Sequence, residues 1–376
     1  MEHDVVVVGA GPAGCMTARR LAELGVDVLL IEKRPEIGVP LRCGEATSVR
    51  GIRELGIELN KKFIANETRG VYIYSPNGTK VEMLSETPNG YVLERRIFDK
   101  FLGIYAAKAG AEVRVQTQAV GLLKSNGSVG GIKLRHLGEE YEVECRCVVG
   151  ADGIESKVGR WAGLDVQTSE MVSNAQFEIA GAFLENQKVL EFHFGSRIAP
   201  RGYAWVFPKG NDVANVGLGV RDSSASALEY LKRFVSSRKN LQGNVIGIVA
   251  GAVPVQGPVE KSVENGVLLV GDAARQVDPL TGGGIYNAMR CGTIAAEVLR
   301  EAAQKNDFSE KTLLEYDRRW RAAIGKVLLT SLKIKGILEK MSDEYLDAVA
   351  RAMQAYKFKN IDIKDVGTII SRLPPD

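Results

Sequence analysis

The chain has 376 residues, 45% of them hydrophobic, and its 49 Lys+Arg against 46 Asp+Glu give a formal net charge of +3. This composition is typical of a globular protein of two domains or one large α/β body, and it excludes disorder as the main state. The near-neutral charge predicts no nucleic-acid partner, and the three scattered histidines (His3, His136 and His193) predict no metal site and no Ser-His-Asp triad.

The first 31 residues predict a βαβ unit. Residues 4–8 are a run of valines before a glycine, which is typical of a buried parallel strand. Residues 12–24 have apolar side chains at helical spacing and end at a glycine, and residues 26–31 predict the next strand. An opening of this kind is the start of a nucleotide-binding domain when its turn is rich in glycine.

The later elements alternate between sheet and helix. Residues 33–70 read as loop with a short helix at 48–55, and residues 71–92 read as hairpin strands. Further on we predict a helix over 95–109, strands over 113–116, 129–137 and 141–149, antiparallel strands within 174–219 and 243–259, a strand over 266–270, and helices after residue 284.

The turn after the first strand has the spacing Gly9, Gly11, Gly14, with Ala13 inside it. The first glycine permits a tight turn, the second a close approach to a pyrophosphate, and the third close packing of helix on strand. Glu32 ends the second strand, where a carboxylate accepts ribose hydroxyls and repels a 2′-phosphate, so FAD or NAD is favoured over NADP. The alternative is a structural turn with a surface glutamate.

A second glycine cluster follows the strand at 266–270. Gly271 and Asp272 come directly after that strand, and Gly282 to Gly284 precede the helix that starts at Ile285. A strand, an aspartate and a glycine-rich turn before a helix indicate a second site where backbone approaches a phosphate or a ring.

Together with Arg95 in the segment ERRIFD (94–99) and the Asp152-Gly153 pair, these motifs resemble the p-hydroxybenzoate hydroxylase-type FAD proteins in residue type and order. The resemblance implies that Asp272 binds the ribityl chain, that Arg95 reaches toward FAD, and that the glycine-rich turn places a helix N-terminus at the flavin O2/N1 edge. The chain has Gly159 followed by Arg160 where that superfamily has an arginine one position earlier, which leaves a direct NAD(P)H contact open.

Two further segments resemble the geranylgeranyl reductase family, notably the archaeal digeranylgeranylglycerophospholipid reductases. They are the loop PLRCGEA (40–46) and the strand YAWVFP (203–208) followed by Gly217-Leu218-Gly219. The resemblance implies an FAD-dependent reductase that saturates C=C bonds of geranylgeranyl chains on archaeal-type glycerophospholipid precursors. The alternatives are an FAD-dependent monooxygenase or halogenase acting on an aromatic or quinone-like substrate, and a flavin-carrying module without its own substrate. Candidate electron donors are ferredoxin, NAD(P)H, a deazaflavin or a quinol.

Alkene reduction by a flavin needs a hydride at one carbon and a proton at the other. Tyr203, Trp205 and Phe207 alternate along a strand and share a face, either as a substrate-binding wall or as ordinary sheet core. Cys43 is either a small buried hydrophobe or a thiol that shapes or protonates the alkene. Glu45, the second candidate catalytic residue, holds Arg42, lines the pocket, or is a solvated or salt-bridged loop residue.

The cofactor-binding residues expected from these motifs and resemblances are Gly9, Gly11, Ala13, Gly14, Glu32, Arg42, Cys43, Gly44, Ala46, Arg95, Ala119, Asp152, Gly153, Gly271, Asp272, Gly283, Gly284 and Ile285. The expected fold class is α/β. A Rossmann-type FAD-binding domain (1–70, 93–170 and 260–300) is interleaved with an antiparallel-sheet substrate domain (71–92 and 171–259), and a helical region (301–376) follows.

The protein is expected to be cytoplasmic, with peripheral contact at the inner face of a membrane as a second hypothesis. Five cysteines without a CxxC pair favour a reducing compartment, and the N-terminus does not resemble a signal peptide. On a helical wheel, Lys326, Lys333 and Lys340 lie opposite an apolar arc, with Lys335 turned inward. Such a helix either packs on the domain or lies on an anionic lipid surface. The apolar arc comprises Ile324, Val327, Leu328, Leu332, Ile334 and Leu338, while Leu329 and Ile337 stray outward.

Overall fold

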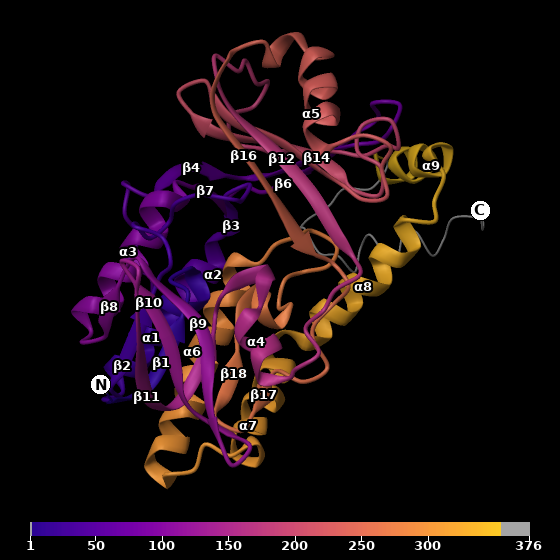
Figure 1. Cartoon of the computed structure of the whole chain (residues 1–376). Coiled ribbons are helices and arrows are strands. Elements are labelled where there is room, and N and C mark those ends of the chain that lie inside the picture. The colour runs from indigo at the N-terminus through magenta and orange to yellow at the C-terminus, as the bar shows by residue number, and fades with distance from the viewer. Residues whose placement is uncertain (1, 355–376) are drawn as a thin grey trace. The chain divides into compact units, whose positions relative to one another are not determined.

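The computed structural model describes residues 2–354 of the chain (Figure 1). They divide into two compact units, each built from three chain segments. The first unit holds residues 2–41, 95–170 and 254–332, and the second holds residues 42–94, 171–253 and 333–354. Residues 355–376 of the predicted helical region lie outside the described part.

The first unit contains an eight-stranded sheet in the order β17-β18-β11-β1-β2-β8, with β10 and β9 added to β11 as antiparallel strands. β18, β11, β1, β2 and β8 run parallel to one another. The strands are β1 (Glu2–Val8), β2 (Val28–Ile31), β8 (Glu112–Arg114), β9 (Thr117–Ser125), β10 (Ser128–His136), β11 (Glu139–Gly150), β17 (Val263–Glu264) and β18 (Val267–Leu269).

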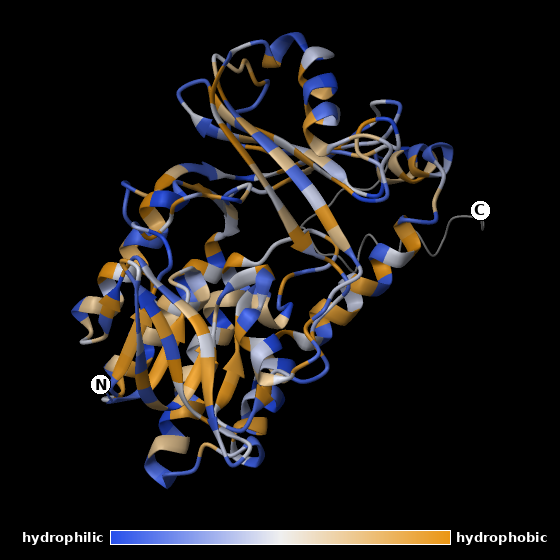
Figure 2. Ribbon diagram, viewed as in Figure 1, coloured by the Kyte–Doolittle hydropathy of each residue, from blue (hydrophilic) through white to orange (hydrophobic). Residues whose placement is uncertain are grey.

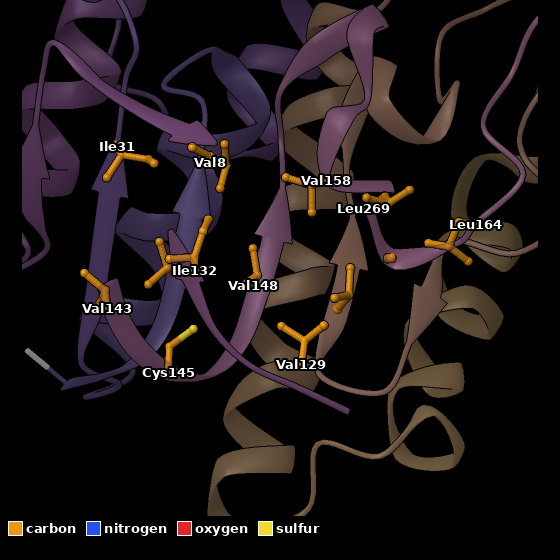
Figure 3. Close-up of a cluster of buried hydrophobic side chains, with 14 of the residues drawn as sticks. Val8, Ile31, Val129, Ile132, Val143, Cys145, Val148, Val158, Leu164 and Leu269 are labelled. Atoms are coloured by element: carbon orange, nitrogen blue, oxygen red, sulfur yellow. The ribbon is translucent and has the colours of Figure 1, made fainter. Parts of the chain in front are cut away.

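Apolar strand residues make the core of this unit, and the central strands are orange in Figure 2. Val8, Ile31, Val148 and Leu269 are buried in a cluster with side chains of β10 and the segment after β11 (Figure 3). The run of valines in β1 therefore has the burial expected of a parallel strand covered on both faces. The helices are α1 (Pro12–Glu23), α3 (Arg95–Lys108), α4 (Lys157–Ala162), α6 (Ile285–Lys305) and α7 (Glu310–Trp320).

The second unit contains a seven-stranded sheet and a small three-stranded sheet. The large sheet has the order β16-β12-β15-β14-β13-β5-β6, and the small one the order β3-β7-β4. The strands are β3 (Ala46–Ser48), β4 (Ile64–Thr68), β5 (Gly70–Tyr74), β6 (Lys80–Leu84), β7 (Gly90–Leu93), β12 (Met171–Ala180), β13 (Leu190–His193), β14 (Tyr203–Gly210), β15 (Val213–Val220) and β16 (Asn244–Pro254). The unit also holds α2 (Val49–Glu54), α5 (Ala227–Ser236) and α9 (Asp343–Gln354).

The two faces of the large sheet have different characters. Ala204 and Val206 of β14 belong to an apolar cluster that also contains Leu231 and Phe234 of α5. The alternate residues of β14 point to the opposite face, because side chains alternate along a strand. That second face carries the aromatic residues Tyr203, Trp205 and Phe207.

Most predicted elements of the first half are present, including the βαβ opening, the hairpin β5–β6 and the helix α3. The elements β3, β4, β9, α4 and α5 were not predicted from the sequence. Residues 42–70, which we expected in the FAD-binding domain, group with the second unit, because β3 and β4 pair with β7 and β5 pairs with β13. The C-terminal helices divide between the two units instead of forming a region of their own.

The basic helix is α8 (Lys326–Leu338), which follows a π-helical turn at Arg321–Gly325. Ile324 and Leu328 of the predicted apolar arc are buried, whereas Val327 of the same arc is 58% exposed. Lys335 is buried and pairs with Glu339 at 3.5 Å. Within residues 2–354, no helix has both the length and the apolar character needed to cross a bilayer.

Candidate functional site

The turn between β1 and α1 has the shape that its glycines predict. Gly9 has a φ of +102°, and a Cβ there would lie 2.5 Å from the Ala151 carbonyl oxygen. A Cβ on Gly14 would lie 1.9 Å from the Gly9 carbonyl oxygen, whereas a Cβ on Gly11 would meet nothing within 4 Å. The helix therefore packs tightly on the strand, and its uncapped N-terminus opens at Gly11 toward a side where an anion can approach.

Glu32 lies directly after β2, beside this turn. Its two carboxylate oxygens accept hydrogen bonds from the backbone N–H groups of Ala10 at 3.1 Å and Arg34 at 2.9 Å. These bonds fix the carboxylate at the carboxyl edge of the sheet. That is the location where a ribose-binding carboxylate is needed in a Rossmann-type site.

Two buried aspartates follow the neighbouring strands. Asp152 comes after β11, and one of its oxygens accepts the N–H of Val158 at 3.0 Å. The other oxygen, Oδ1, is buried without a hydrogen-bond partner among the described residues. Asp272 comes after β18, and burial raises the pKa of both carboxyls, although Arg95 opposes this for Asp272. An unsatisfied buried oxygen is costly to the fold and indicates a place where a ligand can donate a hydrogen bond.

Arg95 is fixed at the start of α3 by Asp99. Its guanidinium donates to the two Asp99 oxygens at 3.1 and 2.6 Å. A bidentate pair of this kind sets the direction of the side chain as well as its charge. Arg95 is therefore a rigid cation whose field also acts on Asp272.

The second glycine cluster forms a turn that is stabilised by hydrogen bonds to the Asp278 carboxylate. Asp278 Oδ1 accepts the N–H groups of Leu280 at 3.0 Å and Thr281 at 2.9 Å. A Cβ on Gly284 would lie 3.3 Å from the Asp272 Oδ1 atom, so this turn sits directly against Asp272. Ile285 then starts the 21-residue helix α6, which has no side-chain cap.

These features lie at the carboxyl ends of four adjacent parallel strands, β2, β1, β11 and β18. Ligands of open α/β sheets bind at that edge. The donor set fits a dinucleotide with a flavin ring: a glycine turn with an open helix N-terminus, a fixed carboxylate, an orphan aspartate oxygen, and a second glycine turn. Ala13 also lies here, because a Cβ on Gly271 would come within 2.9 Å of its methyl group.

Other predicted cofactor-binding residues have different surroundings. Ala119 lies in β9 and is buried in the apolar core of the first unit. Arg42, Cys43, Gly44 and Ala46 belong to the second unit.

The departure at Gly159 has a packing reason. A Cβ at this position would lie 2.7 Å from Ser156 Oγ, 2.8 Å from Val166 Cγ1 and 2.9 Å from Leu269 Cδ1. There is no room for the arginine that the superfamily motif has at this position.

In the second unit, the predicted aromatic residues are together on one face. Trp205 and Phe207 pack in one cluster with Tyr203 and Phe192, and the Tyr203 and Trp205 ring centroids are 6.0 Å apart. Gly217 pairs with Trp205 across β14 and β15, and a Cβ on it would lie 2.4 Å from the indole Cζ2 atom. The Trp205 ring therefore packs directly on Gly217, where any side chain would collide with it.

The loop that contains Cys43 packs on this aromatic face. A Cβ on Gly44 would lie 3.0 Å from the Phe207 ring and 3.4 Å from Trp205 Nε1. Cys43 is half-buried, and the other four cysteines are buried. The Cys43 sulfur accepts the backbone N–H of Glu45 at 3.2 Å.

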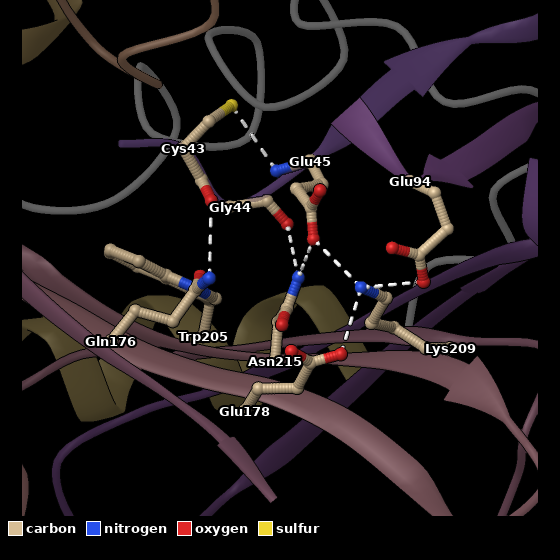
Figure 4. A network of polar contacts seen from close by, with 9 residues as sticks. All are labelled: Cys43, Gly44, Glu45, Glu94, Gln176, Glu178, Trp205, Lys209 and Asn215. Atoms are coloured by element: carbon tan, nitrogen blue, oxygen red, sulfur yellow. Dashed lines mark hydrogen bonds and ion pairs between the residues drawn. The ribbon is translucent and has the colours of Figure 1, made fainter. Parts of the chain in front are cut away.

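Glu45 is salt-bridged, and it is not solvated. It is 1% exposed, and its Oε2 accepts hydrogen bonds from Lys209 Nζ at 3.1 Å and Asn215 Nδ2 at 2.6 Å (Figure 4). Sequence reasoning missed both partners. Lys209 continues the alternation Tyr203, Trp205, Phe207 by one further step, and that pattern is the signal that would have found it.

His193 is buried inside the second unit, and both of its ring nitrogens are hydrogen-bonded. It is fully buried, donates from Nε2 to Glu191 at 3.0 Å and accepts at Nδ1 from Arg238 at 2.8 Å. Burial lowers the pKa of His193, and the Arg238 charge lowers it further against the opposite effect of Glu191. A neutral imidazole with both nitrogens engaged is not available as a proton donor.

Comparison with known proteins adds two family matches. Residues 2–195 match the FAD binding domain family, and residues 170–253 match the geranylgeranyl reductase catalytic domain. The chain therefore carries FAD as its cofactor.

Two curated relatives, from Methanocaldococcus jannaschii and Methanosarcina mazei, are each 46% identical and bear the name digeranylgeranylglycerophospholipid reductase. The alignments cover 99% of this chain and 96% of the first relative, and 97% and 92% for the second.

Two solved structures are similar to this chain along most of its length. A geranylgeranyl bacteriochlorophyll reductase-like protein from Thermoplasma acidophilum superposes with a TM-score of 0.95 at 39% identity, over 99% of this chain and 96% of that one. A p-nitrophenol 4-monooxygenase from Pseudomonas putida has a TM-score of 0.75 at 21% identity, over 98% and 97% of the two chains. The similarity to the monooxygenase shows only that the two chains share a fold.

Proposed function

We propose, since the chain belongs to the digeranylgeranylglycerophospholipid reductase family, that it saturates the C=C bonds of geranylgeranyl chains on archaeal-type glycerophospholipid precursors. When bound in its reduced form, FAD would supply the hydride for one alkene carbon. The observation that carries the proposal is the row of aromatic side chains packed against the loop of the half-buried Cys43. A polyprenyl chain has almost no hydrogen-bonding groups, so it needs such an apolar surface.

The residues that would hold the cofactor lie in the first unit. Gly11 and the α1 N-terminus would receive the diphosphate, and Glu32 the ribose of the adenosine. Asp272, which lies against the Gly284 turn, would bind the ribityl chain. The α6 N-terminus, close to the same turn, would stabilise negative charge on the reduced ring.

Cys43 is the proposed proton donor. Its S–H bond breaks as a C–H bond forms at the second alkene carbon, and the thiolate that remains takes its proton back from water. The N–H of Glu45 at 3.2 Å from the sulfur supports this role, since it stabilises the thiolate as it forms. Tyr203, Trp205 and Phe207 would hold the chain in place beside it.

The function is tested by anaerobic incubation of dithionite-reduced protein with a digeranylgeranyl glycerophospholipid, followed by mass spectrometry. A gain of one H₂ for each saturated bond is expected. A gain of oxygen on an aromatic or quinone-like substrate in air would instead support the monooxygenase alternative. Loss of turnover in Cys43→Ala with an unchanged FAD content is expected, and unchanged turnover would end the proton-donor assignment. Replacing dithionite by NAD(P)H, ferredoxin, a deazaflavin or a quinol would identify the electron donor.

We further propose that α8 contacts an anionic lipid surface with the face that carries Lys326 and Lys333, together with Lys340, which follows the helix. Lys326, Lys333 and Lys340 are exposed, and Leu329 and Ile337 are 53% and 50% exposed between them. Lysines attract anionic lipid headgroups, and exposed large apolar side chains add to the binding by entering the boundary of the acyl chains.

Co-sedimentation with phosphatidylserine-containing liposomes tests the contact. Lys326/Lys333/Lys340→Glu should bind less than the matched control Lys61/Lys62/Lys232→Glu, whose lysines are exposed elsewhere in the second unit. Equal binding of the two variants would rule out an electrostatic role for the helix.

A further inference from the structure

A buried ion cluster underlies the Cys43 loop in the second unit. Lys209 is 7% exposed, and its Nζ lies 3.1 Å from Glu45, 2.7 Å from Glu94 and 3.0 Å from Glu178 (Figure 4). These carboxylates come from the loop before β3, the residue after β7, and β12. One ammonium therefore ties three separate segments of the chain to β14.

The cluster is connected to Cys43 through Glu45. The Glu45 backbone has a φ of +75°, a left-handed conformation that a residue with a side chain rarely adopts. In this conformation its N–H points at the Cys43 sulfur. A backbone that is unfavourable by itself persists only where the surroundings hold it, and here the holding groups are those on the buried carboxylate.

Neighbouring amides complete the support of the loop. Asn215 Nδ2 donates to the Glu45 carboxylate at 2.6 Å and to the Gly44 carbonyl at 3.3 Å. Gln176 Nε2 donates to the Cys43 carbonyl at 3.1 Å, and Trp205 Nε1 orients Gln176 through a 2.9 Å bond to its oxygen. Gln176 of β12 and Asn215 of β15 thus fix the main chain at Cys43 and directly after it.

We propose that Lys209 is a positioning residue that holds the Cys43 thiol in its orientation by anchoring Glu45. This inference rests on the proposed function, in which Cys43 gives the proton. It also makes Glu45 a positioning residue, because its carboxylate oxygen is committed to Lys209 and Asn215. Burial opposes the charge on Lys209, but Glu45, Glu94 and Glu178 raise the pKa of its ammonium above the usual value. The anchor therefore stays charged throughout the neutral range.

Hydrogen exchange of the intact FAD-loaded protein tests the anchoring without any assay of activity. In Lys209→Met, amides of residues 42–46 should exchange about tenfold faster than in the wild type, because the loop opens locally. Lys209→Arg should restore most of the protection. Lys80→Met is the matched control, since Lys80 also pairs with two carboxylates, Glu82 and Glu185, on another edge of the same sheet. It should leave the exchange of residues 42–46 unchanged.

A double-mutant cycle tests whether the anchoring acts through Cys43. Lys209→Met should lower kcat at least about tenfold with a smaller change of KM and an unchanged FAD content. In the Cys43→Ala background the same substitution should change kcat little, because the positioned group is already absent. Equal losses in both backgrounds would show that Lys209 supports only the fold, which overturns the proposal.

A second variant covers the case in which Lys209→Met does not fold. Asn215→Leu removes the direct bonds to Glu45 and Gly44 and leaves Lys209 with its partners, so it should also speed exchange in residues 42–46. Unchanged exchange in that variant would overturn the anchoring. If the wild-type protein does not saturate the lipid, the proposed function is wrong. The hydrogen-exchange experiment would still test whether Lys209 anchors residues 42–46.

Discussion

A methyl group added at Gly217 should displace the Trp205 ring from the aromatic face. In Gly217→Ala the added Cβ would lie 2.4 and 2.5 Å from two atoms of the Trp205 indole and 2.9 Å from the Ala175 carbonyl oxygen. The backbone oxygen belongs to the paired strand β12 and cannot move away, so the indole must tilt. That tilt would break the 2.9 Å bond from Trp205 Nε1 to Gln176.

The expected cost has two parts. Overpacking a filled site costs about 1–3 kcal/mol, and loss of a buried hydrogen bond adds about 1 kcal/mol or more. Gly217→Ala should therefore lower the free energy of unfolding by about 2–4 kcal/mol. FAD content should stay unchanged because Gly217 belongs to the second unit, and KM for the lipid should rise because Trp205 is displaced.

Urea unfolding followed by circular dichroism measures the loss, with near-ultraviolet spectra as the readout of the Trp205 environment. The matched control is Gly130→Ala, a glycine of strand β10 where a Cβ would meet nothing within 4 Å. Its free energy of unfolding should change by less than about 0.5 kcal/mol. If Gly217→Ala is as stable as this control, Trp205 is not held against Gly217 and the reasoning about the aromatic face is wrong.

Two further predictions follow from the glycine turn and the buried histidine. Gly14→Ala should lose bound flavin, measured as visible absorbance of the purified protein, because its Cβ would lie 1.9 Å from the Gly9 carbonyl oxygen; retained flavin would contradict the tight turn. Since the pKa of His193 is lowered in the folded state, the native protein binds fewer protons there than the unfolded chain. Stability should therefore fall as pH drops through about 6.5, by at most about 1.4 kcal/mol per pH unit, and His193→Gln should flatten this part of the stability curve measured in urea. An unchanged slope would show that His193 is not the group responsible.

The cofactor site could be predicted from the sequence because its signals are local. Gly9, Gly14 and Glu32 act within one βαβ unit, and Asp152 and Asp272 each follow directly after their own strands. Parallel strands place their carboxyl ends at one edge, so residues in these local positions meet without further information. The shared face of Tyr203, Trp205 and Phe207 was predictable for the same reason, since alternation is a property of the strand itself.

Only the tertiary structure decided what lies beneath Cys43 and which side of α8 is buried. Glu45, Glu94, Glu178 and Lys209 come from distant segments, and their meeting depends on strand register and loop docking, which no local periodicity encodes. The helical wheel of α8 separates two faces but does not show what each face contacts, and Val327 of the apolar arc is exposed while Ile324 and Leu328 are buried. Residue spacing along the chain thus determined the cofactor turns and the aromatic row. Packing between distant segments determined the charges that hold the Cys43 loop.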